Sequence, residues 1–247
     1  MTLNVAIISD IHANLPALES VWAHAQELGA EEIWNMGDHA GYSPFPLQTV
    51  DWLQQHNAIS VLGDYDLRIL QAQEKRSEWG RMKHPTKLEA ILWARQQLAR
   101  SGLDYLEDLP KTRTLERAGF KFVLNHGSPA AIDEGLAPST SLKRLRKLAA
   151  KVEADAVLSG DSHRPFVKEV EGVTFINPGS VGRPDDGDPR ASYGLLQIDQ
   201  DGFEVKLYRV AYEVTRTVEA IRSANLPEEF AQMMIQGRSF DDINWHG

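Results

Sequence analysis

Five short segments combine carboxylates and imidazoles in a fixed order along the chain. They are Asp10-Ile11-His12, Gly37-Asp38, Gly63-Asp64-Tyr65-Asp66, His126-Gly127 and Gly160-Asp161-Ser162-His163. Asp and His are ligands for hard and borderline divalent cations. The chain has no cysteine, which excludes thiolate metal sites, disulfides and thiol nucleophiles. A single D-x-H or G-D pair occurs by chance in many chains. Five such segments in this order are a much more specific signal, and they predict a two-metal hydrolytic site.

Apolar, β-branched runs precede most of these segments and read as buried strands. The runs cover residues 5–9, 33–36, 59–62 and 156–159. Helical patterns at 15–28 and 47–53 separate the first three runs, so the first third of the chain is predicted to consist of βαβ units. The carboxyl ends of such strands are where an α/β sheet presents its functional groups.

The second half of the chain is predicted to be richer in hairpins. Three hairpins are expected, at 112–124, 166–176 and 191–210, and the first of them leads into His126. A helix is expected at 141–152, helices are expected between 67 and 100, and a helical tail is expected at 214–238. Without a linker or repeat, residues 1–247 are predicted to form a single domain.

The order and spacing of the five segments resemble the calcineurin-like metallophosphoesterase family, whose blocks run D-x-H, G-D, G-N-H-[DE], a lone H before G, and G-H-x-H. The likeness is closest to the small bacterial and archaeal phosphodiesterase branch, through Ile-Ser-Asp-Ile-His-Ala-Asn-Leu at 8–15 and Asn-Pro-Gly-Ser-Val-Gly at 177–182. The resemblance implies an α/β fold, a four-layer αββα sandwich of two mixed β-sheets flanked by helices.

The resemblance also implies two divalent metal ions and their ligands. It assigns Asp10, His12 and His163 to the first metal, Asp38 to a bridge, and Asp64, His126 and Asp161 to the second. Mn²⁺ is the preferred cation, with Fe, Mg²⁺ or Zn²⁺ as alternatives. The predicted catalytic residues are Tyr65, Asp66 and His126, where Tyr65 stands in place of the family's leaving-group histidine and Asp66 accepts its phenol hydrogen bond or caps the next helix.

Three positions depart from the family pattern. Asp64 replaces an asparagine, Tyr65 a histidine, and Asp161 the first histidine of G-H-x-H. Two carboxylates against two divalent cations leave a formal charge of +2, whereas the four in this chain leave zero. A neutral cluster attracts phosphate less and acidifies water less, so slower turnover, altered metal preference or single-metal occupancy is expected.

Several residues near the motifs are candidates for further roles. Asn177, Gly179 and Arg183 are predicted to bind substrate, and Arg190 is a second candidate for a phosphate-binding arginine, with surface pairing to nearby aspartates as the alternative. His39 is expected to be an exposed loop histidine, with a compensating ligand or proton donor as the alternative. Asn125 is expected to make a local backbone hydrogen bond rather than a substrate contact.

The composition of the chain limits the kinds of partner that it is expected to bind. The net charge of −9 argues against an extended nucleic-acid surface, and no apolar run of about 18 residues indicates a membrane span. A cytoplasmic protein is expected, because the first residues lack a signal-peptide pattern. The apolar residues of the tail are expected to pack on the same chain, with a homodimer seam as the alternative.

The predicted function is hydrolysis of a phosphodiester or nucleotide-like phosphate ester by attack of a hydroxide that bridges two metals. The predicted partner is therefore a small-molecule phosphate ester or nucleotide. The alternative is a metal- or nucleotide-binding protein that keeps the same fold with weakened catalysis.

Overall fold

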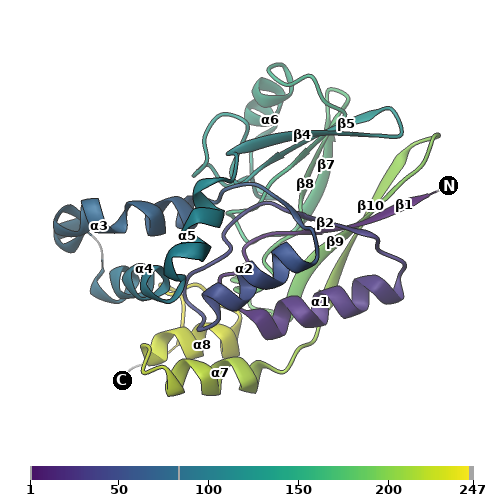
Figure 1. The fold of residues 1–247 in the computed structure, drawn as a ribbon. Helices are drawn as coiled ribbons and strands as arrows, with labels where there is room; N and C mark the ends of the chain where they lie inside the picture. The colour runs from purple at the N-terminus through teal and green to yellow at the C-terminus, as the bar shows by residue number, and fades with distance from the viewer. Residues whose placement is uncertain (1, 83, 245–247) are drawn as a thin grey trace.

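Two five-stranded sheets face each other in the computed structural model, which describes residues 2–82 and 84–244 (Figure 1). The first sheet has the order β10-β9-β1-β2-β3. Its strands are β1 (Leu3–Ile8), β2 (Glu32–Asn35), β3 (Ile59–Ser60), β9 (Ala191–Ile198) and β10 (Phe203–Val210). β1, β2 and β3 run parallel, whereas β9 pairs antiparallel with both β1 and β10, so the sheet is mixed.

The second sheet has the order β4-β5-β6-β8-β7 and is also mixed. Its strands are β4 (Thr112–Arg117), β5 (Phe120–Asn125), β6 (Ala156–Leu158), β7 (Phe166–Val170) and β8 (Val173–Asn177). β5, β6 and β8 run parallel, and the antiparallel β4–β5 and β7–β8 pairs are the hairpins expected from the sequence.

The space between the sheets is filled by side chains from alternating strand positions. Ile7 and Trp34 of the first sheet pack with Phe122, Leu124 and Ile176 of the second, and all five are buried. Alternate residues of a strand point to opposite faces, so the remaining positions face helices on the outside.

Helices cover the two outer faces of the sandwich. α1 (Leu15–Glu27) and α2 (Pro46–Gln55) pack on the first sheet, where Leu18 and Val21 meet Ala6 and Ile8. α6 (Leu142–Ala149) lies on the outer side of the second sheet (Figure 1). Its buried residues Leu145 and Leu148 pack there with Val157 and Phe175. The layers are therefore helix, sheet, sheet, helix, which confirms the predicted αββα sandwich.

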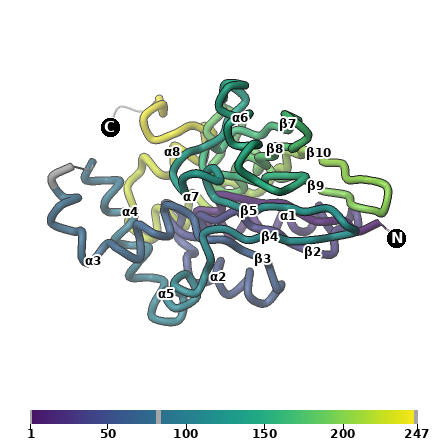
Figure 2. The backbone as a smooth tube through the Cα atoms, turned by 90° about the horizontal axis from the view of Figure 1, so that it is seen from above, coloured from purple at the N-terminus to yellow at the C-terminus, as the bar shows by residue number. Residues whose placement is uncertain are grey.

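A helical group with its own apolar core lies at one end of the sandwich. It contains α3 (Asp64–Met82), α4 (Pro85–Gln97), α5 (Ala99–Glu107), α7 (Val214–Ser223) and α8 (Glu228–Gln236). α3 extends away from the end where the β9–β10 hairpin lies, as both views show (Figure 2). α5 was not predicted; it is set off from α4 at Ala99, whose φ is 53°.

The helices of the C-terminal region pack against the rest of the same chain. Ile221, Phe230, Met233 and Met234 are buried in the core of the helical group, while Ile235 is 45% exposed. In the described part of the chain, no helix has the length and apolar character needed to cross a membrane.

Candidate metal centre

The metal-ligand candidates lie on the loops that follow parallel strands of both sheets. Asp10 and His12 follow β1, Asp38 follows β2, His126 follows β5, and Asp161 and His163 follow β6, while Asp64 is the first residue of α3 after β3. The facing sheets bring their carboxyl ends to one edge, so these loops meet.

The backbone of these loops turns sharply at the candidate ligands. Asp10, His12, Asp38, Asp161 and His163 have φ between 47° and 60°, the left-handed region that non-glycine residues rarely adopt. Residues held there cost folding free energy and occur most often at functional sites. A side chain on Gly160 would collide with Ser9 Oγ and Asp10 Oδ2, which explains the glycine before Asp161.

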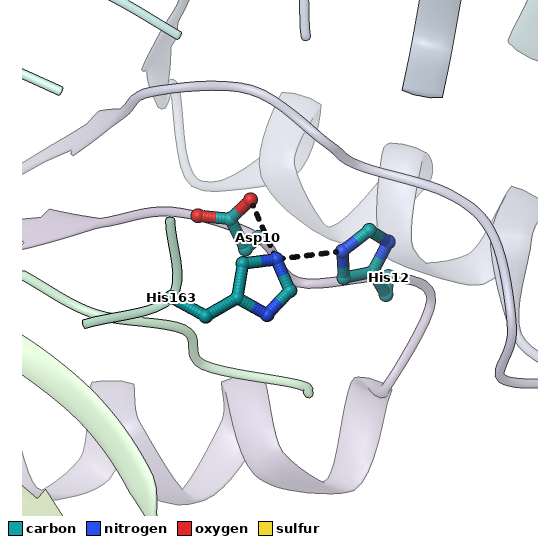
Figure 3. Close-up of side chains that lie close together, drawn as sticks. All are labelled: Asp10, His12 and His163. Carbon is teal, nitrogen blue, oxygen red and sulfur yellow. Dashed lines mark hydrogen bonds and ion pairs between the residues drawn. The ribbon is translucent and has the colours of Figure 1, made fainter. Parts of the chain in front are cut away.

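The first half-site consists of Asp10, His12 and His163 (Figure 3). His163 Nε2 lies 3.2 Å from Asp10 Oδ1 and 3.3 Å from His12 Nε2. His163 Nδ1 donates a hydrogen bond to the backbone oxygen of Arg183 over 2.6 Å, which leaves Nε2 free to face the other two side chains. All three residues are buried, as a site of restricted water access requires.

The Asp38 carboxylate lies between the two half-sites. Its Oδ2 is 3.5 Å from His12 Nε2, and its Oδ1 is 3.4 Å from His126 Nε2. His126 Nδ1 donates to the backbone oxygen of Met36 over 2.7 Å, so His126 Nε2 also faces the centre. Each Asp38 oxygen therefore faces the imidazole of a different half-site, which is the arrangement that a bridging ligand needs.

The second half-site consists of Asp64, His126 and Asp161. His126 Nε2 lies 3.8 Å from Asp64 Oδ1 and 3.8 Å from Asp161 Oδ1. The structure therefore brings all seven predicted ligands into one cluster.

Burial and crowded charges shift the pKa values of the cluster. Burial raises the pKa of Asp38 well above its usual value, and Asp64 adds to this effect. Burial, with neighbouring Asp64, raises the pKa of Asp161 to about 6. Burial lowers the pKa of His126, but Asp38 and Asp64 outweigh it and the pKa rises. The pKa of Asp10 is lowered because His163 outweighs burial. Crowded carboxylates of this kind favour a bound cation.

The donor set fits divalent cations. Asp10 Oδ1 and His126 Nε2 are buried yet have no hydrogen-bond partner within residues 2–82 and 84–244. Both atoms point into the cluster, toward His163 and Asp38 respectively. Buried polar atoms are rarely left without partners, and a coordinated cation would satisfy these two.

Comparison with known proteins agrees with this geometry. Residues 3–201 match the family model of the calcineurin-like phosphoesterase superfamily domain. The chain belongs to this superfamily. It is 30% identical to a metallophosphoesterase of Sphaerobacter thermophilus, whose crystal structure it matches over 96% of this chain and 100% of that chain with a TM-score of 0.79.

Two archaeal proteins are also similar over nearly their whole length. An uncharacterized protein of Methanocaldococcus jannaschii is 30% identical, covering 95% of this chain and 98% of that protein. A hypothetical protein of Pyrococcus horikoshii has the same fold with a TM-score of 0.87 at 21% identity, covering 95% and 98% of the two chains.

His39 differs from its sequence-based prediction. It is fully buried rather than exposed, with Nδ1 donating to Asp66 Oδ2 over 2.7 Å and Nε2 accepting from Asn35 Nδ2 over 2.9 Å. The prediction assumed the alternation of an extended chain, but Asp38 adopts a left-handed φ of 56° and turns the next side chain inward.

Asp66 supports the loop after β2 and does not contact the Tyr65 phenol. Its carboxylate accepts the backbone N–H groups of Asp38, His39 and Gly63 over 2.9 to 3.0 Å. Gly63 directly precedes α3, so the hydrogen bond from its N–H to the Asp66 carboxylate caps the helix. A cap of this helix was one of the two expectations for Asp66. The other expectation, a phenol hydrogen bond, is wrong because these groups already surround the carboxylate.

Tyr65, which departs from the superfamily pattern, is buried beside the first half-site. Its ring is perpendicular to the His12 ring with the two centroids 5.5 Å apart, and the centroid of the Tyr42 ring lies 5.0 Å from that of Tyr65. Burial raises the pKa of the Tyr65 phenol well above its usual value, and Tyr42 reinforces the shift. The phenol is therefore protonated at neutral pH, so it can donate a hydrogen bond but does not act as a phenolate base.

The predicted substrate residues have different surroundings. Arg183 lies at the site, with Nη2 3.3 Å from His163 Nε2 and its guanidinium 4.8 Å from the centre of the Tyr42 ring. Asn177 is buried and donates to the backbone oxygen of Gly160 over 2.7 Å, so it supports the loop that carries Asp161. Arg190 pairs with Asp188, which is the surface alternative.

Asn125 and Gly179 make contacts within the protein that bear on their predicted roles. Asn125 Oδ1 accepts from Thr112 Oγ1 over 3.1 Å, so the expected backbone hydrogen bond is wrong. Gly179 has a φ of 77°, and its N–H donates to Asn177 Oδ1, so it serves the turn.

Two residues beside the site were missed at the sequence level. Arg68 pairs with Asp64, and Tyr42 lies between Arg183 and Tyr65. The i,i+4 spacing of Asp64 and Arg68 was a usable signal, but the helix was expected to begin only at residue 67, whereas α3 begins at Asp64. Nothing in the local sequence marks Tyr42.

Proposed function

We propose that this protein is a metal-dependent phosphoesterase that hydrolyses phosphodiesters or nucleotide-like phosphate esters with two divalent cations in the metal centre. The position of Asp38 is the main support, because its two oxygens face His12 and His126 in different half-sites. Bound cations would supply charge for the phosphoryl oxygens and an activated water. Membership of the phosphoesterase superfamily supports the reaction class.

Residues of the chain supply the remaining groups. The buried Asp and His side chains hold the cations, and the histidines are oriented by backbone carbonyls through Nδ1. Arg183, beside His163, is placed to bind a phosphoryl oxygen through its guanidinium. The Tyr65 phenol remains a hydrogen-bond donor and is a poor proton shuttle, so esters with good leaving groups are the best substrates.

The carboxylate-rich second half-site supports a preference for cations that favour oxygen ligands. Asp64 and Asp161 stand around the single imidazole of His126. Hard oxygen donors suit Mn²⁺, Mg²⁺ and Fe ions better than Zn²⁺, and Mn²⁺ is the cation we propose.

The proposal is tested by removing all metal with a chelator and adding back Mn²⁺, Mg²⁺ or Zn²⁺ separately. We expect about two equivalents of Mn²⁺ per chain and hydrolysis of bis(p-nitrophenyl) phosphate. The change Asp38→Asn should abolish hydrolysis and reduce Mn²⁺ binding, whereas Asp51→Asn on the exposed side of α2 should do neither. Two tightly bound zinc ions with high activity would contradict the preference for Mn²⁺.

A triple variant distinguishes the proposed enzyme from the alternative, a binding protein with weakened catalysis. Asp64→Asn, Tyr65→His and Asp161→His together restore the family pattern. An inert wild type whose triple variant gains activity supports the binding protein, whereas an active wild type supports the enzyme.

A further inference from the structure

The two oxygens of the Asp64 carboxylate face different partners. Oδ1 faces the metal centre, 3.8 Å from His126 Nε2, while Oδ2 forms a short ion pair with Arg68 Nη2. Arg68 lies one turn further along α3, at the i+4 position from Asp64. One oxygen is therefore engaged by the guanidinium, and the other remains free for a cation.

The guanidinium is held at this place from two sides. Besides its ion pair with Asp64, it lies 5.8 Å from the centre of the Tyr65 ring. A guanidinium stays charged in proteins, so Arg68 places a positive charge against the Asp64 carboxylate of the metal centre.

We propose that Arg68 is a positioning residue that orients the Asp64 carboxylate and neutralises its charge, so that the pair acts as a neutral metal ligand. The superfamily pattern has an uncharged asparagine where this chain has Asp64, and the pair of Asp64 with Arg68 carries no net charge. The same pair also fixes the carboxylate, so that only Oδ1 faces His126. The inference rests on the proposed metal centre, and it explains how the chain accommodates an additional carboxylate there.

A second i,i+4 pair shows what sets this one apart. Arg100 and Asp104 on α5 have the same spacing, but their side chains are 75% and 48% exposed. Such surface pairs are screened by water and salt and contribute little. The Asp64 side chain is only 9% exposed, so water screens its charge less. Both the negative charge of Asp64 and its neutralisation by Arg68 therefore change the electrostatic potential in the metal centre.

The compensation has opposite consequences for cations and anions. Without Arg68, the centre becomes more negative by one charge, so binding of a cation should be maintained or strengthened. Binding of a phosphate anion beside the cations should weaken. Loss of a residue that only stabilised α3 would not weaken phosphate binding while keeping or strengthening cation binding.

A double-mutant cycle on the Mn²⁺-loaded protein tests the inference, with Mn²⁺ and inorganic phosphate as ligands measured by titration calorimetry. Arg68→Gln should weaken phosphate binding about tenfold without loss of Mn²⁺ affinity, and Arg68→Lys should retain most of the wild-type affinity. The double variant Asp64→Asn/Arg68→Gln has the same net charge as the wild type, so its phosphate affinity should return to within about twofold of the wild-type value. Arg100→Gln is the matched control and should change nothing.

The outcomes separate this inference from the proposed function. A double variant that binds phosphate as weakly as Arg68→Gln does, or an Arg68→Gln variant that loses no phosphate affinity, overturns the role of Arg68. A wild type that binds no Mn²⁺ overturns the metal centre and the inference together. A wild type that binds Mn²⁺ and phosphate but hydrolyses no ester overturns only the proposed activity.

Discussion

Asp10 Oδ1 lies 3.2 Å from His163 Nε2, although Asp10 follows β1 of the first sheet and His163 follows β6 of the second. The first half-site therefore exists only when the two sheets are packed together. His163 is also fixed to the backbone oxygen of Arg183, so one imidazole connects three loops.

Replacing His163 should remove one cation. In His163→Ala, Asp10 and His12 lose their third partner, and we expect about one equivalent of Mn²⁺ fewer per chain by elemental analysis. His84→Ala, at an exposed position before α4, should keep the wild-type metal content. Unchanged metal content in His163→Ala would exclude His163 as a ligand.

Replacing Asp66 should reduce stability. The change Asp66→Asn removes the negative charge from the group that accepts the His39 Nδ1–H and three backbone N–H groups. Weakening buried hydrogen bonds to a charged group costs about 1.5–3 kcal/mol of unfolding free energy, measurable by urea denaturation. The exposed change Asp104→Asn should cost about 0.5 kcal/mol or less. If Asp66→Asn kept full stability and lost only hydrolysis, Asp66 would be catalytic as the sequence suggested.

The raised pKa of Asp161 predicts a pH-dependent effect in metal-free protein. Its folded-state pKa of about 6 exceeds the ordinary 3.8, so the folded state binds the proton more tightly, and the stability that this contributes is lost as pH rises through 6. Asp161→Asn should therefore stabilise metal-free protein at pH 8, by about 1–3 kcal/mol, and have little effect near pH 4.

Added Mn²⁺ should reverse the effect of Asp161→Asn at pH 8. The cation binds the carboxylate in the folded state, so wild type should gain more in melting temperature than the variant does. Melting curves at both pH values, with and without Mn²⁺, measure these four states. A variant that gains as much from Mn²⁺ as wild type would show that Asp161 is not a ligand.

Gly135 is predicted to control the second half-site. A Cβ added there would lie 2.6 Å from Asp161 Oδ2 and 3.1 Å from Ser162 N, so the Asp161 side chain would have to move. Gly135→Ala should fold but bind the second cation about 10- to 100-fold more weakly in a calorimetric titration. Gly202→Ala adds its methyl group in open space and is the matched control. Equal Mn²⁺ affinity of the two variants would refute this effect.

The sequence by itself determined the βαβ units of the first third, and its resemblance to the superfamily determined the layered fold and the candidate metal ligands. The buried runs that became β1, β2 and β6 each end in a ligand segment, and parallel strands present their carboxyl ends together. Alternation of strand and helix is a local property of residue type and spacing, so it can be read without coordinates. The closeness of Asp10 and Asp38, which follow neighbouring parallel strands, followed from it.

Only the tertiary structure decided the surroundings of those ligands. The burial of His39 depends on a left-handed turn at Asp38, which an extended-chain argument does not foresee. The Asp66 carboxylate accepts the N–H of Asp38, which is 28 residues away in sequence. The contacts of Arg183 with His163 and Tyr42 likewise come from packing between separate loops. Motif spacing identifies which side chains meet, but their charges are balanced by neighbours that only folding brings together.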